Sequence, residues 1–120
     1  GYGIGLDLTA RDIQNALKAK GMPWTTAKGF RHAAWLSVLT KGIPTTHQLS
    51  LTVNGDVRQD DSTDKLLFDM AYQLNFLHEK FGLRQGDIIY TGTPKGVGRL
   101  VRGDTLIAKL DTESYTIHII

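Results

Sequence analysis

Several features that would narrow the class of this protein are missing from its 120 residues. There is no cysteine, which excludes disulfide bonds and thiolate metal sites and leaves only oxygen and imidazole ligands for a metal ion. No apolar run approaches the roughly 20 residues that cross a bilayer, and no signal-like N-terminus is present. We therefore expect a cytoplasmic protein without a membrane segment, in which any bound metal is a hard cation.

The sequence also has no large excess of charge of one sign. The 14 basic and 12 acidic residues are spread along the chain and leave a formal net charge of +2, without a basic tract. This distribution argues against nucleic acid as a partner. With 41% hydrophobic and 22% charged residues, and without a repeat or a shift in composition, residues 1–120 have the make-up of a single globular domain.

The first third of the chain predicts a strand followed by a helix. The chain opens without an initiator methionine on an alternating run over 1–6, which is typical of a strand, and we expect a fragment or a processed chain. Thr9, three residues before Asp12, resembles a capping box, and the helix that it starts would end at Gly21. The aromatic-rich stretch over 23–44 favours an ordered loop with a short strand.

The rest of the chain predicts a hairpin, a second helix and a β-rich end. Asn54 followed by Gly55 is the strongest short signal for a hairpin. Apolar residues at three- and four-residue spacing indicate a helix within 62–80, at least from Asp69, and Gly82 would stop it. The expected strands are 49–53 and 57–59 around the turn, then 88–90, 105–110 and 115–120.

Asp7, Arg11 and Gln14 are the first group of residues that could carry chemistry. Arg11 and Gln14 share one face of the expected helix, while Ile13 and Leu17 would face the core. A carboxylate suits a hard metal ion, and a guanidinium one turn away suits bidentate capture of a substrate carboxylate. The same spacing also permits an ordinary ion pair between Asp7 and Arg11.

Lys28 and the glycine-rich loop over 91–98 are two further candidates. Small and aromatic residues flank Lys28 and could desolvate its ammonium group, which would then stabilise an enolate or oxyanion; a solvated surface lysine is the alternative. The loop contains Gly92 and Thr93, and its N–H groups and hydroxyls could bind an anion. It lacks the ending of a phosphate loop, and a tight turn with glycines at positive φ is its alternative.

Four motifs, taken together and in order, resemble the fumarylacetoacetate hydrolase family and span nearly the whole chain. They cover residues 6–14, 21–30, 53–59 and 86–98. The resemblance implies an α+β, mainly β fold, a mixed β-sandwich or roll with two or three helices, usually in a homodimer. Residues 1–120 would form the C-terminal part of the catalytic domain of that family.

The same resemblance assigns roles to individual residues. It implies Mg²⁺ or Mn²⁺, with Ca²⁺ possible, held by two glutamates and one aspartate, and Asp7 matches the aspartate. The glutamate pair and a water-activating His/Glu dyad would belong to an N-terminal segment that these 120 residues do not contain, so we expect this chain alone to be inactive. The positions that contact the substrate are matched by Arg11, Gln14, Lys28, Gly92 and Thr93, with Lys28 also catalytic.

The activity that the resemblance implies is hydrolysis of a C–C bond in a 2,4-dioxo acid of the acylpyruvate or fumarylpyruvate class. The reaction would pass through a metal-bound enolate, and Lys28 would stabilise the charge that develops on its oxygen. Decarboxylation of oxaloacetate, or an isomerase or hydratase step on a related 2-oxo acid, shares that enolate and stays open. A non-catalytic remnant that keeps the fold for association is the alternative of another class.

Overall fold

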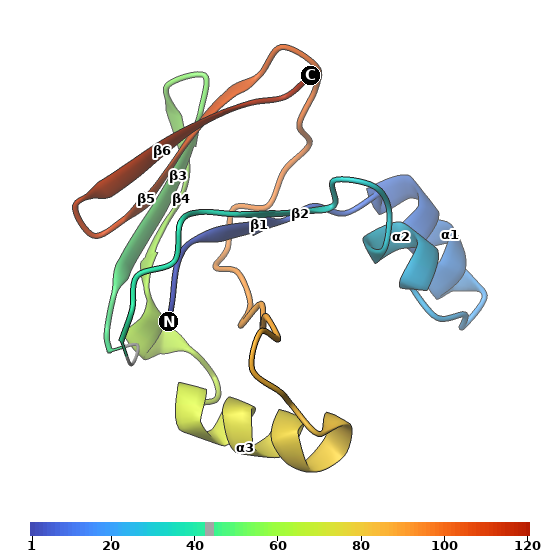
Figure 1. Ribbon diagram of the computed structural model, residues 1–120. Coiled ribbons are helices and arrows are strands. Elements are labelled where there is room, and N and C mark those ends of the chain that lie inside the picture. The colour runs from blue at the N-terminus through green and yellow to red at the C-terminus, as the bar shows by residue number, and fades with distance from the viewer. Residues whose placement is uncertain (43–44) are drawn as a thin grey trace.

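The computed structural model describes residues 1–42 and 45–120, and it confirms an α+β fold built from two antiparallel sheets. The main sheet has the strand order β4-β3-β5-β6, and a separate ribbon pairs β1 with β2. The ribbon lies between the main sheet and the helix pair α1 and α2 (Figure 1). The strands are β1 Gly5–Asp7, β2 Ala34–Leu36, β3 Gln48–Val53, β4 Asp56–Ser62, β5 Thr105–Leu110 and β6 Glu113–His118. The helices are α1 Arg11–Ala19, α2 Thr25–Lys28, the 3-10 turn η1 Thr63–Lys65, and α3 Met70–Phe81.

The main sheet contains the hairpin that the sequence predicts. Asn54 and Gly55 have φ values of 53° and 90°, as a tight two-residue turn between twisted strands requires. The returning strand β4 is longer than predicted and reaches Ser62. The buried apolar side chains of the sheet alternate along their strands and so lie on one face; they are Val53, Leu106, Ala108 and Leu110.

Helix α3 begins and ends close to the predicted positions. The Asp69 carboxylate accepts a hydrogen bond from the Tyr72 N–H at 2.7 Å, and Gly82 adopts the left-handed conformation at φ 65° that ends the helix. No residue of α3 is buried. Phe68, Tyr72 and Phe76 are exposed, and their rings stack successively on one another.

Two predictions of local structure are wrong. No strand forms over 88–90, where the chain follows an irregular path. Thr9 does not cap α1, since the N-cap residue is Ala10 and no side chain caps it. The reason is a tertiary contact, because the Thr9 hydroxyl accepts a hydrogen bond from Lys28 Nζ at 2.8 Å.

The boundaries of the ribbon also differ from the prediction. The first strand starts at Gly5 rather than at residue 1, because Tyr2 makes only an isolated bridge to Thr40. The stretch over 23–44 contains the predicted short strand, β2, and an additional helical turn, α2. Residues 43 and 44 of that stretch lie outside the described residues.

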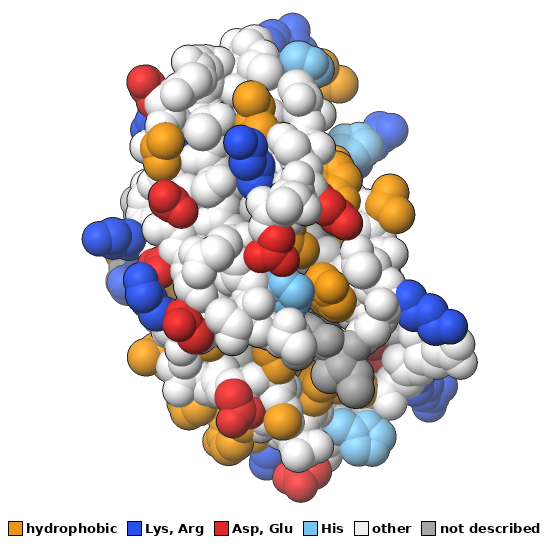
Figure 2. Space-filling model, turned by 90° about the vertical axis from the view of Figure 1, so that its left-hand side faces the viewer, with side chains coloured by type: hydrophobic (Ala, Val, Ile, Leu, Met, Phe, Trp, Pro, Cys, Tyr) orange, Lys and Arg blue, Asp and Glu red, His pale blue; other side chains and the backbone are white. Residues whose placement is uncertain are grey.

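Among the described residues there is no candidate membrane-spanning helix, and the face shown in Figure 2 carries no field of one charge. None of the helices within 1–42 and 45–120 is both long and apolar enough to cross a bilayer. On the face shown in Figure 2, acidic and basic side chains are interspersed and apolar side chains lie between them. This mixture agrees with the small net charge of the sequence.

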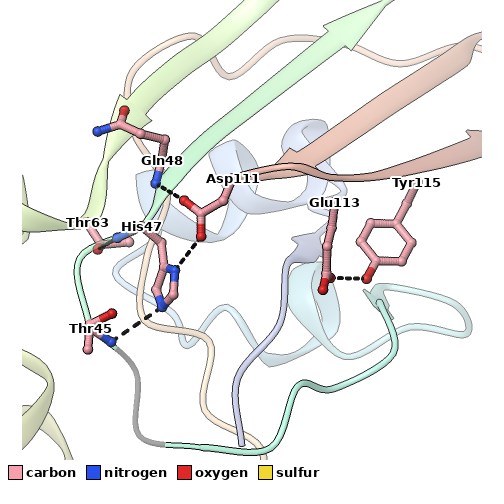
Figure 3. Close-up of polar contacts among 7 residues, drawn as sticks. All are labelled: Thr45, His47, Gln48, Thr63, Asp111, Glu113 and Tyr115. Atoms are coloured by element: carbon pink, nitrogen blue, oxygen red, sulfur yellow. Dashed lines mark hydrogen bonds and ion pairs between the residues drawn. The ribbon is translucent and has the colours of Figure 1, made fainter.

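A buried histidine joins the start of β3 to the turn between β5 and β6 (Figure 3). His47 Nδ1 lies 2.7 Å from Asp111 Oδ2, and the other carboxylate oxygen accepts a hydrogen bond from the Gln48 N–H at 2.8 Å. The imidazole also packs on the Tyr2 ring, with centroids 4.4 Å apart. Asp111 has a φ of 52°, an uncommon conformation for a residue with a side chain, and these contacts hold it there.

Replacing Asp111 by Ala is expected to lower the thermal stability at neutral pH but not in strong acid. The hydrogen bond with His47, and next the one from the Gln48 N–H, hold the pKa of Asp111 below its ordinary value of 3.8. A carboxyl whose pKa is lower in the folded state stabilises the fold above its unfolded pKa, and this contribution is lost as the pH falls through the folded value. Unfolding curves for the wild type and Asp111→Ala should therefore converge below pH 3.8. A constant separation at every pH, or the same loss in Asp56→Ala at the first residue of β4, would contradict this.

Candidate active site

Pairing of β1 with β2 brings the end of β1 next to α2. Asp7 lies opposite Ala34 in the ribbon, and three residues later the Ala10 N–H donates a hydrogen bond to the Ala27 carbonyl at 3.0 Å. Ala27 is fully buried, and α1 packs against α2 at this point. The chain after Asp7 is thus fixed alongside α2, whose last residue is Lys28.

Asp7, Thr9 and Lys28 form a polar cluster at this junction. Lys28 Nζ lies 2.7 Å from Asp7 Oδ1 and donates a hydrogen bond to Thr9 Oγ1 at 2.8 Å. The side chains of Lys28 and Asp7 remain 35% and 48% exposed, so a ligand can reach them. An ammonium group has three hydrogens, and two of them face these partners. Lys28 is therefore an oriented cation with one hydrogen left to donate, and not a freely solvated lysine.

Arg11 and Gln14 form a second pair on α1. Arg11 Nη1 donates a hydrogen bond to Gln14 Oε1 at 2.6 Å, which leaves the Gln14 NH₂ and the remaining guanidinium N–H groups as donors. The alternative ion pair between Asp7 and Arg11 is wrong, since among the described residues the Asp7 carboxylate pairs with Lys28. The prediction that Ile13 faces the core is also wrong. Ile13 is 43% exposed and Gln14 is buried, because α1 packs mainly against the four-residue helix α2.

Tyr90 brings the glycine-rich loop beside β1 and β2 (Figure 1). Its hydroxyl donates a hydrogen bond to the Trp35 carbonyl at 2.9 Å, and its ring packs so closely on Gly5 that a Cβ there would lie 2.6 Å from a ring carbon. Burial raises the pKa of the Tyr90 hydroxyl, and the neighbouring Asp7 carboxylate raises it further. No local pattern in the sequence marks Tyr90, because its contacts are with residues far away in the chain.

Thr93 is held by Gln59 of β4, the last residue of the family-like motif over 53–59, to which the resemblance assigns no role. Gln59 Nε2 donates hydrogen bonds to Thr93 Oγ1 and to the Pro94 carbonyl, both at 2.8 Å. Gly92 and Gly96 have φ values of 117° and 105°, so these two glycines of the loop adopt positive φ, and the chain bends at Lys95 between them. Thr93 and Gly92 are nevertheless exposed and open to a ligand.

The donors around Asp7 suit one part of a metal site. Carboxylate oxygens are the ligands that Mg²⁺ and Mn²⁺ prefer. In the part of the chain that the structure describes, no group of three or more His, Cys, Asp or Glu side chains is placed to hold a metal ion. Asp7 therefore fits as a single ligand, and a complete site needs further oxygens from outside this cluster.

Comparison with known proteins gives a consistent set of relatives. The family profile "Fumarylacetoacetate (FAA) hydrolase C-terminal" matches residues 1–117. The mitochondrial oxaloacetate tautomerase FAHD1 of Homo sapiens is 42% identical over 112 residues, covering 90% of this chain and 51% of that protein. A fumarylpyruvate hydrolase from Ralstonia is 37% identical over 114 residues, covering 92% of this chain and 59% of that protein.

Solved structures agree with these relatives. The crystal structure of fumarylpyruvate hydrolase from Pseudomonas aeruginosa, in complex with Mn²⁺ and pyruvate, matches with a TM-score of 0.95 at 34% identity, covering 100% of this chain and 54% of that one. This chain thus spans about half the length of the relatives that it matches. The four motifs, the antiparallel sheets and the three α-helices lead to one conclusion: the chain belongs to the fumarylacetoacetate hydrolase family.

Proposed function

We propose that this chain provides the substrate-binding and charge-stabilising part of a divalent-metal-dependent active site for a small 2-oxo acid. The observation that carries the proposal is the position of Lys28, whose ammonium is oriented by Asp7 at 2.7 Å and by Thr9 at 2.8 Å. Oxaloacetate, fumarylpyruvate and pyruvate, the compounds in the names of the relatives and of their solved complex, are all 2-oxo acids. Mn²⁺ in the relative from Pseudomonas aeruginosa supports a divalent cation here.

Each group has a role that follows from its chemistry. The donors of Arg11 and Gln14 bind a substrate carboxylate, while the Thr93 hydroxyl and the Gly92 N–H hold the keto-acid end. Lys28 stabilises the negative charge that develops on the enolate oxygen, because a fixed cation needs no reorganisation as the charge appears. A divalent cation bound through Asp7 would polarise a carbonyl oxygen as a Lewis acid.

Tautomerisation of oxaloacetate is the reaction that we place first, because relatives with that name reach 44% identity. Removal of a proton from the carbon next to the 2-oxo group gives the enolate, and return of a proton to its oxygen gives the enol. Lys28 favours the enolate in both directions. Neither a homodimer nor a cytoplasmic location is needed for this chemistry, and both stay predictions.

Hydrolysis of a C–C bond in fumarylpyruvate, the activity that the family resemblance of the sequence implies, is the second candidate. The Ralstonia relative, at 37% identity, supports it. Water attacks the distal carbonyl, the C–C bond breaks, and pyruvate leaves as its enolate and then takes up a proton. Because the same enolate forms in both reactions, Lys28 has the same role in each. The products distinguish them, since only hydrolysis releases pyruvate and fumarate.

Removal of divalent metal is expected to abolish activity. The natural full-length polypeptide that carries this sequence would be assayed for keto–enol interconversion of oxaloacetate, by ultraviolet absorbance of the enol, and for pyruvate release from fumarylpyruvate. Treatment with EDTA should remove activity, and Mg²⁺ or Mn²⁺ should restore it, because the carbonyl loses its Lewis acid. A metal-saturated protein that acts on neither substrate would contradict the proposal and favour a role in association alone.

A further inference from the structure

Strand β4 contains a bulge that turns Gln59 toward the buried face of the sheet. Across the hairpin, Val57 pairs with Thr52 and Gln59 pairs with Leu51. Leu51 and Thr52 are neighbours in β3, so they face opposite sides of the sheet. Val57 and Gln59 therefore face opposite sides as well, and Arg58 is the extra residue of the bulge. Exposure agrees, since Val57 is 67% exposed and Gln59 only 9%.

The bulge also brings the backbone of β4 against the glycine-rich loop. A Cβ placed on Gly96 would overlap the Arg58 carbonyl oxygen, and Gly96 has a φ of 105°. Only glycine permits both this approach and this conformation. The glycine-rich loop therefore packs directly on the bulge of β4, and the Gln59 side chain lies beside Thr93.

Pro94 fixes the orientation of the Gln59 amide. A carbonyl oxygen can only accept a hydrogen bond, so the amide atom that lies 2.8 Å from the Pro94 oxygen is the NH₂ nitrogen. Its second hydrogen is donated to Thr93 Oγ1 at 2.8 Å. One of the two lone pairs of Thr93 Oγ1 thus accepts from Gln59, and the hydrogen of the hydroxyl points away from this donor, where it is free to meet a ligand.

We propose that Gln59 is a positioning residue that makes the Thr93 hydroxyl a hydrogen-bond donor toward the anionic end of the substrate. The inference rests on the proposed function, in which Thr93 holds the keto-acid end of a 2-oxo acid. Carboxylate and enolate oxygens only accept hydrogen bonds. A hydroxyl turned the other way would present its lone pairs to the anion, so the direction of the Gln59 bond decides whether Thr93 attracts or repels the substrate.

Substitution of Gln59 by Glu reverses this hydrogen bond at almost constant shape. A carboxylate cannot donate to Pro94 and accepts the hydrogen of the Thr93 hydroxyl instead. In the full-length enzyme we expect Gln59→Glu to raise the KM for oxaloacetate about 10- to 100-fold, with a smaller change in kcat, as for the loss of a hydrogen bond to a charged group. Gln59→Met, which removes the bonds without adding charge, should raise the KM less. Gln85→Glu, an exposed loop substitution with the same change of charge, should leave it unaltered.

A double-mutant cycle with Thr93→Val separates positioning from a general structural effect. Without the hydroxyl there is nothing for Gln59 to orient, so adding Gln59→Glu to Thr93→Val should change the KM by less than about twofold. Independent structural damage would instead multiply the two effects, which would overturn the inference. Thermal unfolding identifies any variant that fails to fold, and Gln59→Met then serves in the same cycle.

The outcomes keep this inference distinct from the function on which it rests. If the wild-type enzyme acts on a 2-oxo acid and the folded variants Gln59→Glu and Gln59→Met have the same KM as the wild type, only the inference about Gln59 would be overturned. A wild-type enzyme inactive on oxaloacetate and fumarylpyruvate would overturn the proposed function and, with it, this inference. If Gln59→Glu raises the KM in the wild type but not in the Thr93→Val background, the result would establish both the proposed function and the role of Gln59.

Discussion

Asp7→Asn is expected to lower kcat/KM by more than roughly a hundredfold, since even residues that only support a metal ligand cost about 10- to 100-fold when changed. Asn keeps the size of the side chain but removes the charge that holds a divalent cation. The loss should therefore appear in the affinity for Mn²⁺, measured by titration calorimetry, as well as in the activity. Within the described residues, Asp7 is the carboxylate that we assign to the metal ion.

The fold should survive this substitution. The ion pair between Asp7 and Lys28 is partly exposed, 48% and 35%, and pairs of this kind contribute only about 0–1 kcal/mol to stability. Asp12→Asn on the exposed surface of α1 is the matched control and should bind metal as the wild type does. An Asp7→Asn protein that retains wild-type affinity for Mn²⁺ would show that this carboxylate is not a metal ligand.

Lys28→Met is expected to lower kcat about 100- to 1,000-fold, the usual effect of removing one donor from a developing oxyanion. Met keeps the length of the side chain and removes the ammonium that Asp7 and Thr9 orient. The KM should change less than kcat, because the charge that Lys28 stabilises develops mainly during the reaction. Steady-state kinetics with oxaloacetate and with fumarylpyruvate would measure both constants.

Two further variants make the Lys28 prediction specific. Lys18→Met removes an exposed lysine from the last turn of α1 and should leave kcat unaltered. Lys28→Arg keeps the charge but carries a planar fork that does not reproduce the contacts of an ammonium, and should recover only part of the activity. A folded Lys28→Met enzyme with wild-type kcat on both substrates would exclude Lys28 from the stabilisation of the enolate.

Local signals explain the parts of the fold that the sequence predicts well. Asn54 and Gly55 specify a tight turn because they tolerate positive φ, and the hairpin forms around them. Asp69 and Gly82 mark the ends of α3 through contacts within a few residues. The family motifs also propose a set of site residues, Lys28 among them, but they do not predict the contacts that these residues make.

The contacts of the site were decided by tertiary structure. Thr9 has the spacing of a helix cap, yet it binds Lys28, which lies 19 positions away in the sequence. The Thr9 hydroxyl can either cap α1 or accept a hydrogen bond from Lys28. The packing of α1 on α2 decides between these two contacts.

Gln59 is the clearest case of a residue whose contact partner could not be predicted from the sequence. A regular hairpin closed by Asn54 and Gly55 would place Gln59 opposite Ser50, on the other face of the sheet. The bulge at Arg58 shifts it opposite Leu51 and toward Thr93, which lies 34 positions away. By itself, the sequence determined the hairpin turn and the two ends of α3, because those depend on near neighbours. The partners of the polar site residues depended on tertiary structure, since one extra residue in a strand reverses the face of every side chain beyond it.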